Sequence, residues 1–479
     1  MTSDSSYEDK ELAILRKAVD AADQRTNRRA VNSPEIREII VVVENFLRKK
    51  KLICYGGTAI NNILPSEDQF YDKSVEIPDY DFFSNDALED AKELADIYTK
   101  KGFDEVEAKS GVHKGTFKVF VNYIPVADIT QLDIELYRNI KRDAISIAGI
   151  LYTPPNYLRM SMYLELSRPN GDVSRWEKVL KRLTLLNKNY PLQGYKCNEQ
   201  KFQRSMEDLE TGVDDIYNIV KTSFIHQGVI FFGGFANTLY SKYMPRNLKK
   251  QMQNIPDFDI LSENPDTCVT IVKERLMDAG VKRIKIIKHP GLGEVIAPHY
   301  EIKVSSETIA FVYQPLACHS YNIINIKRNA IKIATIDTML SFYLAFLYSD
   351  RSYYDDDRIL CMAHFLFKVQ QKNRLQQKGL LKRFSINCYG KQETLEDNRY
   401  KKSEMYKKLK GKRDSKEYEE WFLKYSPTSS SADKEENPKK EKHGKNYGKK
   451  HKTRRRRDGK KNKKRKTRQV KVNFGSIEI

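Results

Sequence analysis

The feature of this sequence that most constrains its fold is an internal repeat. Three short segments, at 55–59, 77–82 and 160–164, return in the second part of the chain after 177, 178 and 180 residues. Tyr-Gly-Gly-Thr-Ala becomes Phe-Gly-Gly-Phe-Ala, Ile-Pro-Asp-Tyr-Asp-Phe becomes Ile-Pro-Asp-Phe-Asp-Ile, and Met-Ser-Met-Tyr-Leu becomes Leu-Ser-Phe-Tyr-Leu. Matches at nearly one spacing predict a duplicated domain of about 180 residues.

Both copies show the same order of expected elements. A helix is followed by a short apolar strand that ends in Gly-Gly, then by a short helix, a strand that carries Asp-x-Asp, an amphipathic helix, a strand-rich stretch and further helices. In the first copy these elements are expected at 34–50, 52–55, 58–64, 77–83, 86–101, 103–132 and 154–186. The predicted class is α+β: two tandem domains of mixed sheet with flanking helices, followed by a disordered basic C-terminal tail.

The composition suggests where the domains begin and end. We predict five segments: an N-terminal helical extension (1–30), a complete domain (31–195), a degenerate copy (196–375), a helical or linker region (376–432) and a basic disordered tail (433–479).

Positive charge is concentrated in that tail. The 479 residues carry a formal charge of +21, and 439–471 alone contain nineteen Lys or Arg against two acids. Three interpretations stay open: a nuclear address, a solubilising extension, or an arm that binds the nucleic-acid backbone. The densest positions are Arg454, Arg455, Arg456, Arg457, Lys463, Lys464, Arg465 and Lys466.

The cysteines and the apolar runs indicate the compartment. Six cysteines are scattered without a Cys-x-x-Cys pair, which predicts neither a zinc site nor a disulfide framework and favours a reducing environment. The polar, acidic first ten residues are unlike a signal peptide, and no apolar run approaches the roughly 20 residues of a membrane span. We therefore expect a soluble protein with no membrane partner.

The Asp-x-Asp strand is the best candidate for a catalytic, metal-binding site. Asp79 and Asp81 project from the same face of a strand, and two adjacent carboxylates repel each other unless a cation lies between them. Asp128 lies in an apolar strand where an acid is otherwise costly, although Asp133 and Glu135 are nearby alternatives. Three such carboxylates could hold two divalent cations for phosphoryl transfer.

Just upstream, Gly56 and Gly57 would let the backbone approach phosphates at a helix N-terminus, and the Thr58 hydroxyl could donate to them. The glycine pair, the Asp-x-Asp strand and the third strand carboxylate resemble the polymerase-β-like nucleotidyltransferases. In its tandem arrangement and in the sequences of its motifs, the chain most resembles the poly(A) polymerase catalytic subunits of nucleocytoplasmic large DNA viruses. The stretch 65–76 is longer than the usual loop of this family and is expected to be an insertion.

The resemblance implies roles for individual residues. Gly56, Gly57 and Thr58 would contact the triphosphate of ATP, and Asn156, Arg159 and Arg168 lie on a helix expected to face it. Asp79, Asp81 and Asp128 would be the catalytic residues and the ligands of two Mg²⁺ or Mn²⁺ ions, and Asp128 would also help to activate the RNA 3′-hydroxyl.

The implied reaction is template-independent addition of AMP to mRNA 3′ ends with release of pyrophosphate. The resemblance places it in the cytoplasmic viral factory of the host and in the virion. Two other functions fit the same residues: a different RNA terminal nucleotidyltransferase, or a non-enzymatic RNA-binding scaffold.

The second copy lacks part of the motif. Phe311 aligns with Asp128, no acid occurs in 308–322, and Phe235 replaces Thr58. Asp257 and Asp259 therefore have no third partner. We predict that this copy is catalytically silent and serves to contact RNA or to form a homodimer.

Overall fold

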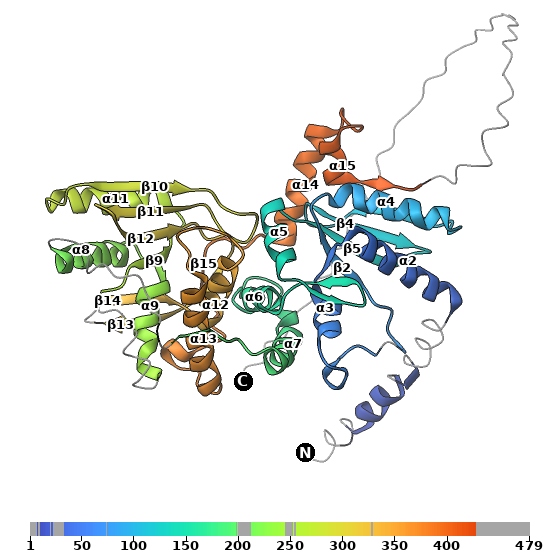
Figure 1. The fold of residues 1–479 in the computed structure, drawn as a ribbon, viewed down its shortest axis with the longest axis horizontal. Helices are drawn as coiled ribbons and strands as arrows, with labels where there is room; N and C mark the ends of the chain where they lie inside the picture. Colours follow the sequence, from blue (N-terminus) through green and yellow to red (C-terminus); the bar gives the residue numbers. More distant parts are fainter. Residues whose placement is uncertain are drawn as a thin grey trace, which may run out of the picture. The chain divides into compact units, whose positions relative to one another are not determined.

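The computed structural model describes residues 7, 10–19, 21–22, 33–72, 74–197, 199, 212–244, 252, 255–326 and 329–427. These residues form two eight-stranded mixed sheets with flanking helices (Figure 1). The predicted α+β class with two tandem domains is confirmed. The basic positions singled out in 454–466 lie outside the described residues.

The first half of the chain builds the first sheet. Its helices are α2 (Pro34–Lys50), α3 (Gly56–Ile63), α4 (Ala87–Lys100), α5 (Ile134–Arg142), α6 (Pro155–Leu166) and α7 (Trp176–Asn189). Its strands are β1 (Ile53–Cys54), β2 (Tyr80–Ser84), β3 (Val106–Ser110), β4 (Thr116–Val121), β5 (Ile124–Gln131), β6 (Ile145–Ile147) and β7 (Ile150–Tyr152). No strand is assigned to the described part of the stretch 65–76, in agreement with the expected insertion.

The second half repeats this plan. Its helices are α8 (Val213–His226), α9 (Gly233–Tyr240), α11 (Pro265–Asp278), α12 (Ile336–Phe346) and α13 (Asp356–Lys372). Its strands are β8 (Ile230–Phe232), β9 (Phe258–Leu261), β10 (Ile284–His289), β11 (His299–Val304), β12 (Glu307–Tyr313), β13 (His319–Ile326) and β14 (Asn329–Ala334).

The strand orders of the two sheets show the duplication directly. The first sheet runs β16-β3-β4-β5-β2-β1-β7-β6 and the second β10-β11-β12-β9-β8-β14-β13-β15. Seven strands correspond one to one, and the eighth strand of each sheet comes from the C-terminal segment. That segment consists of β15 (Cys388–Tyr389), α14 (Leu395–Leu409), α15 (Lys416–Phe422) and β16 (Lys424–Tyr425).

Local sequence explains why these elements form where they do. Ser33 caps α2 by accepting from the Ile36 amide at 3.2 Å, and Pro34 follows at the first helical position. In β4 the buried residues Phe117 and Val119 alternate with half-buried polar ones, so one face joins the core and the other is left for solvent.

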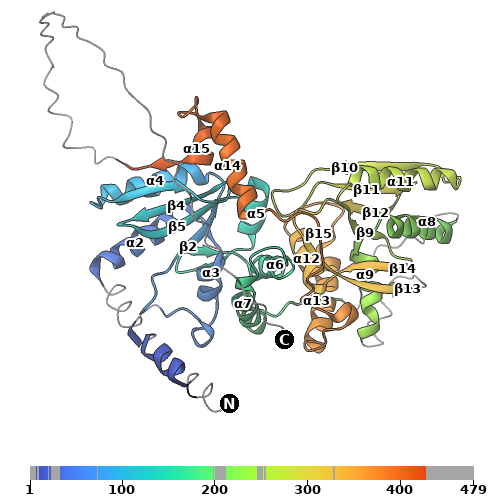
Figure 2. The ribbon, with the colours of Figure 1, turned by 180° about the vertical axis from the view of Figure 1, so that it is seen from behind.

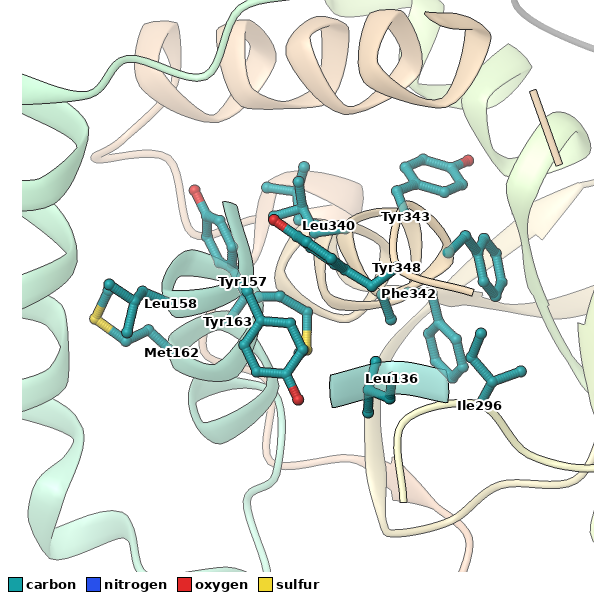
Figure 3. Packing of buried hydrophobic residues seen from close by; sticks show 14 of the residues in the cluster. Leu136, Tyr157, Leu158, Met162, Tyr163, Ile296, Leu340, Phe342, Tyr343 and Tyr348 are labelled. Atoms are coloured by element: carbon teal, nitrogen blue, oxygen red, sulfur yellow. The ribbon is translucent and has the colours of Figure 1, made fainter. Parts of the chain in front are cut away.

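The two halves pack through equivalent helices. α6 and α12, which carry the third repeated segment, lie side by side in both views (Figures 1 and 2). Figure 3 shows the aromatic contacts there, among them Tyr157 on α6 against Tyr348 just after α12, with ring centroids 5.2 Å apart. The Tyr163 hydroxyl also donates to Gln370 at 3.3 Å. The halves therefore share one continuous apolar core.

The absence of a disulfide framework was a wrong expectation. Cys197 pairs with Cys361 and Cys318 with Cys388, whereas Cys54 and Cys268 are free and buried. The bonded partners are 164 and 70 residues apart, so only the folded chain brings them together. Among the described residues, no helix is long and apolar enough to cross a membrane.

Candidate active site

The three predicted carboxylates meet on neighbouring strands. β2 and β5 are parallel, and Asp81 on β2 is the direct cross-strand partner of Asp128 on β5. Asp79 immediately precedes β2, on the same side of the chain as Asp81 because side chains alternate along an extended segment. One strand pair thus brings together residues almost fifty positions apart.

Burial and mutual repulsion both raise the pKa values of Asp81 and Asp79. Burial raises the pKa of Asp81 to about 7, with the charges of Asp79 and Asp128 adding to the effect. The pKa of Asp79 is also raised, by loss of hydration and by Asp128, although its side chain still reaches solvent. Such a cluster is stabilised when positive charge enters it.

Part of that positive charge comes from a lysine. Lys118 on β4 lies directly opposite Asp128 and forms an ion pair with its Oδ2 atom. The other oxygen, Oδ1, is buried and has no hydrogen-bond partner among the described residues. An orphaned carboxylate oxygen beside two further carboxylates is the type of donor set that Mg²⁺ or Mn²⁺ prefers.

In this structure the side chains of Asp79, Asp81 and Asp128 do not converge on one point as the ligands of a bound metal ion would. Within the described part of the chain, no three His, Cys, Asp or Glu side chains form a group that could hold a metal ion as they stand. Oδ2 of Asp128 is engaged by Lys118 in this arrangement.

The structure also separates Asp128 from its two alternatives. Asp133 caps α5 and accepts from the Glu135 amide at 2.9 Å. Glu135 pairs with Arg351 of the second half at 3.0 Å. Both acids thus have structural partners, and only Asp128 lies beside the Asp-x-Asp strand.

The glycine turn lies against these carboxylates. Gly56 has φ +73°, and a Cβ there would overlap Oδ2 of Asp81, so glycine is needed on both counts. The Tyr55 amide donates to the Asp81 carbonyl at 2.9 Å, which fixes the turn to β2. The Thr58 hydroxyl is buried and donates to the Asp79 carbonyl at 2.6 Å. It therefore positions Asp79 in this structure rather than facing a phosphate.

A cationic side chain that the sequence did not single out lies at this turn. Arg182 of α7 donates to the Tyr71 hydroxyl at 2.6 Å and lies over the rings of Phe70 and Tyr71. A Cβ on Gly57 would lie 3.0 Å from the Arg182 guanidinium and would overlap the Tyr71 hydroxyl. The inserted loop and α7 therefore place an arginine against the backbone of the glycine turn.

The structure shows how Arg159 and Asn156, two of the residues expected to face the triphosphate, are placed on α6. Arg159 is fully buried, where it donates to Asn156, to Asn187 at 2.7 Å and to the Tyr190 carbonyl. Burial lowers its pKa to about 10. It holds α6 against α7 and has no face toward a nucleotide.

Arg168 points elsewhere. It lies just beyond α6, in a small cavity with Glu294 and His319 of the second half, and its Nε has no hydrogen-bond partner in the described part of the chain. Burial lowers its pKa. Helical spacing alone did not show which face of α6 meets the second half.

The second half keeps the fold of this site but lacks the third acid. Asp259 on β9 lies opposite Phe311 on β12, which is the register expected from the repeat. Phe311 is fully buried, and Phe235 at the Thr58 position packs on Phe231 and Phe258. Apolar contacts thus occupy the place where the first half presents a carboxylate and a hydroxyl.

Comparison with known proteins adds independent support. Residues 41–172, which span the glycine turn and all three carboxylates, match the family model described as "Poly(A) polymerase catalytic subunit". The predicted resemblance is confirmed. The matched segment runs from the middle of α2 to just beyond α6 and includes the site itself.

Two individual viral proteins with similar sequences carry the same description. A protein of African swine fever virus named "Putative poly(A) polymerase catalytic subunit" is 34% identical over 171 residues, which are 34% of this chain and 36% of that protein. A protein of Acanthamoeba polyphaga mimivirus with the same name is 27% identical over 250 residues, 48% of this chain and 42% of that one. The match thus spans about a third to two fifths of the length of these relatives.

A solved structure shows the same fold over a longer stretch. The crystal structure of the Megavirus polyadenylate synthase superposes with a TM-score of 0.69 and covers 85% of this chain and 84% of its own, at 23% identity. The arrangement of both halves, and not only of the matched segment, is therefore shared with that protein.

Proposed function

We propose that this protein is a template-independent poly(A) polymerase, which transfers AMP from ATP to the 3′ end of mRNA and releases pyrophosphate. The observation that carries the proposal is the direct pairing of Asp81 with Asp128 beside the Gly56 turn. Phosphoryl transfer needs positioned substrates and positive charge near the reacting phosphate. The carboxylates at this site could bind metal cations, and the glycine turn could position a phosphate.

The carboxylates fit divalent cations. Asp79, Asp81 and Asp128 offer hard oxygen ligands, and Asp128 Oδ1 lacks a partner within the described residues. Two Mg²⁺ or Mn²⁺ ions held there would stabilise negative charge on the transferred phosphoryl group. The Asp128 carboxylate would also accept the proton of the RNA 3′-hydroxyl.

The ATP phosphates would lie at the glycine turn. The amides at the N-terminus of α3 favour an anion. Arg182 adds a fixed positive charge next to this backbone. Thr58 contributes by holding the Asp79 carbonyl, which keeps the turn and the carboxylates together.

The proposed preference for adenine and the proposed viral location follow the names and organisms of the relatives. The proposed mRNA end follows the family resemblance of the sequence motifs. Proteins of two viruses share the segment that contains the site and carry the poly(A) polymerase name. All residues used in the proposal come from a single chain, so a homodimer is not needed for the chemistry. The basic tail remains a proposed RNA-binding arm beyond the described residues.

The test is extension of a radiolabelled RNA primer with each of the four NTPs, with Mg²⁺ or Mn²⁺ added. We expect long extension with ATP, and a fall of at least about a hundredfold for Asp128→Asn, since a group that acts in the transition state is lost. The matched control is Asp257→Asn in the second half, which should keep activity within about threefold.

The other results are equally informative. Addition of a few CMP or UMP residues instead of a long AMP tract would identify a different terminal transferase. Absence of any addition, with RNA binding intact, would favour the RNA-binding scaffold. Equal losses from Asp128→Asn and Asp257→Asn would contradict the assignment of the first half as the catalytic one.

A further inference from the structure

A straight row of charged side chains crosses the first sheet. The direct cross-strand partners are Asp81 with Asp128, Asp128 with Lys118, Lys118 with Lys109, and Lys109 with Lys424. Directly paired residues project from the same face of a sheet. The row therefore leads from the carboxylates across β4 and β3 to the edge strand β16, and its last three members are lysines.

These lysines lie on the open face of the sheet. The opposite face carries the buried residues Val119 and Ala108 and is covered by α2 and α4. The side chains of Lys118 and Lys109 are 36% and 42% exposed, and Lys424 is exposed as well. The row is thus accessible from solvent.

Two of the three lysines in the row have a carboxylate partner. Lys109 forms an ion pair with Glu107 at 3.1 Å and also lies over the Phe120 ring, 4.0 Å from its centroid. Lys118 is paired with Asp128. Lys424 lies opposite Lys109 on the edge strand and is exposed. An extended anion along this face would find three cationic side chains in line.

The fold does not require these lysines. In the second sheet the same row runs from Asp259 to Phe311, then to Glu301 and Ile287. Lys118 thus corresponds to Glu301 and Lys109 to Ile287. The lysines occur only in the half that has the complete set of carboxylates, which points to a substrate rather than to packing.

The strand order indicates which substrate this is. The glycine turn follows β1, which flanks β2 on one side, whereas β5, β4, β3 and β16 continue from the other side. The phosphates of ATP are assigned to the glycine turn and Arg182. The lysine row therefore faces the second anionic substrate, the RNA.

We propose that Lys118, Lys109 and Lys424 bind the sugar-phosphate backbone of the last few nucleotides of the RNA and direct its 3′ end to Asp128. This inference rests on the proposed function and extends it to the path of the primer. Three strand spacings of about 4.8 Å give the row a length of about 14 Å, or about four nucleotides at a rise of 3.4 Å. Contacts to the backbone are independent of sequence, as a template-independent enzyme requires.

The experiment measures binding of a fluorescent single-stranded RNA to the full chain by anisotropy between 50 and 200 mM salt. The variant is Lys109→Ala with Lys424→Ala, which leaves Lys118 and the carboxylates in place. Each lost phosphate contact should lower the slope of log Kd against log salt by about 0.7. Over this range the wild type should therefore lose about sevenfold more affinity than the double variant.

A matched control comes from the second half. Lys285 is exposed on β10, the counterpart of β3, and Lys285→Ala should leave the slope unchanged. Thermal unfolding of all variants checks that they are folded. Crosslinking of RNA with 4-thiouridine two to four nucleotides from its 3′ end should label peptides that contain 106–121 or 424–425.

The outcomes separate this inference from the proposed function. An unchanged salt slope, an equal change for Lys285→Ala, or a higher KM for ATP with unchanged RNA affinity would overturn the assignment of the row to RNA. Reduced RNA binding in a protein that adds no nucleotide would support the row and refute the polymerase. Active extension with crosslinks only outside these strands would support the polymerase and refute the row.

Discussion

The two halves of this chain have the same seven-strand order but differ on the face of the sheet that carries the carboxylates in the first half. Where the first half has Asp128 and Lys118, the second has Phe311 and Glu301. The inward-facing positions remain apolar in both, because they are needed for packing. After duplication, the core face preserved the fold while the other face was free to gain or lose chemistry.

The strongest test of this contrast is to place a carboxylate where the second half lost one. Phe311→Asp would bury an acid directly opposite both Asp259 and Glu301. We expect a loss of about 4 kcal/mol or more in the free energy of unfolding, measured by denaturant titration, and no new activity. Phe311→Leu should cost only about 1.5 kcal/mol. A stable Phe311→Asp protein would mean that this position is still prepared for an acid.

The two halves also differ in their disulfide bonds. Both pairs include cysteines of the second half or the segment after it, whereas Cys54 of the first half is free. Alkylation of the unfolded, unreduced protein should modify two cysteines, and reduction should expose six by mass spectrometry. Replacing Cys197 by Ala should lower the free energy of unfolding by about 3 kcal/mol. Six modified cysteines without reductant would show that the pairs do not form.

The glycine turns allow a matched pair of variants. Gly56 and Gly233 have φ of +73° and +59°, so alanine at either should cost about 1–2 kcal/mol in unfolding experiments. Only Gly56→Ala should also reduce primer extension, by at least about tenfold, because its Cβ would displace the Asp81 carboxylate. Similar activity in both variants would contradict the assignment of one catalytic half.

The stability of the first half should also depend on pH. Asp81 has a pKa of about 7 in the folded protein against an ordinary 3.8, so the folded state binds more protons than the unfolded state between these values. The metal-free protein should therefore lose stability as pH rises from about 4 to 7. Asp81→Asn removes this loss and should be more stable than the wild type by about 2 kcal/mol at pH 8 and equal to it near pH 4. Thermal unfolding in EDTA measures the difference, and an equal difference at both pH values would contradict the raised pKa.

Much of the architecture could be predicted from the repeat. Equal spacing of the glycine and Asp-x-Asp segments predicted two similar mixed-sheet domains, and the period of two in a strand placed Asp79 and Asp81 on one face. The repeat aligned Phe311 with Asp128, and the register of the two sheets agrees with that alignment. These predictions depend on local backbone geometry, which a short segment determines by itself.

Features that depend on tertiary contact were missed. Arg182 reaches the glycine turn from a helix 125 residues later, and its only signal was the aromatic pair in the inserted loop. Arg159 looked like a surface residue because helical spacing does not show that α7 covers it. The two-residue strands β15 and β16 are too short to have a recognisable pattern.

Those two short strands have a consequence for how the protein is made. β15 completes the second sheet and β16 the first, yet both lie in the last part of the described chain. During synthesis on the ribosome, β13 and β3 therefore lack their edge partners until residues 388–389 and 424–425, respectively, have emerged. Truncation before 388 would leave both edges open, and such edges invite pairing with other chains.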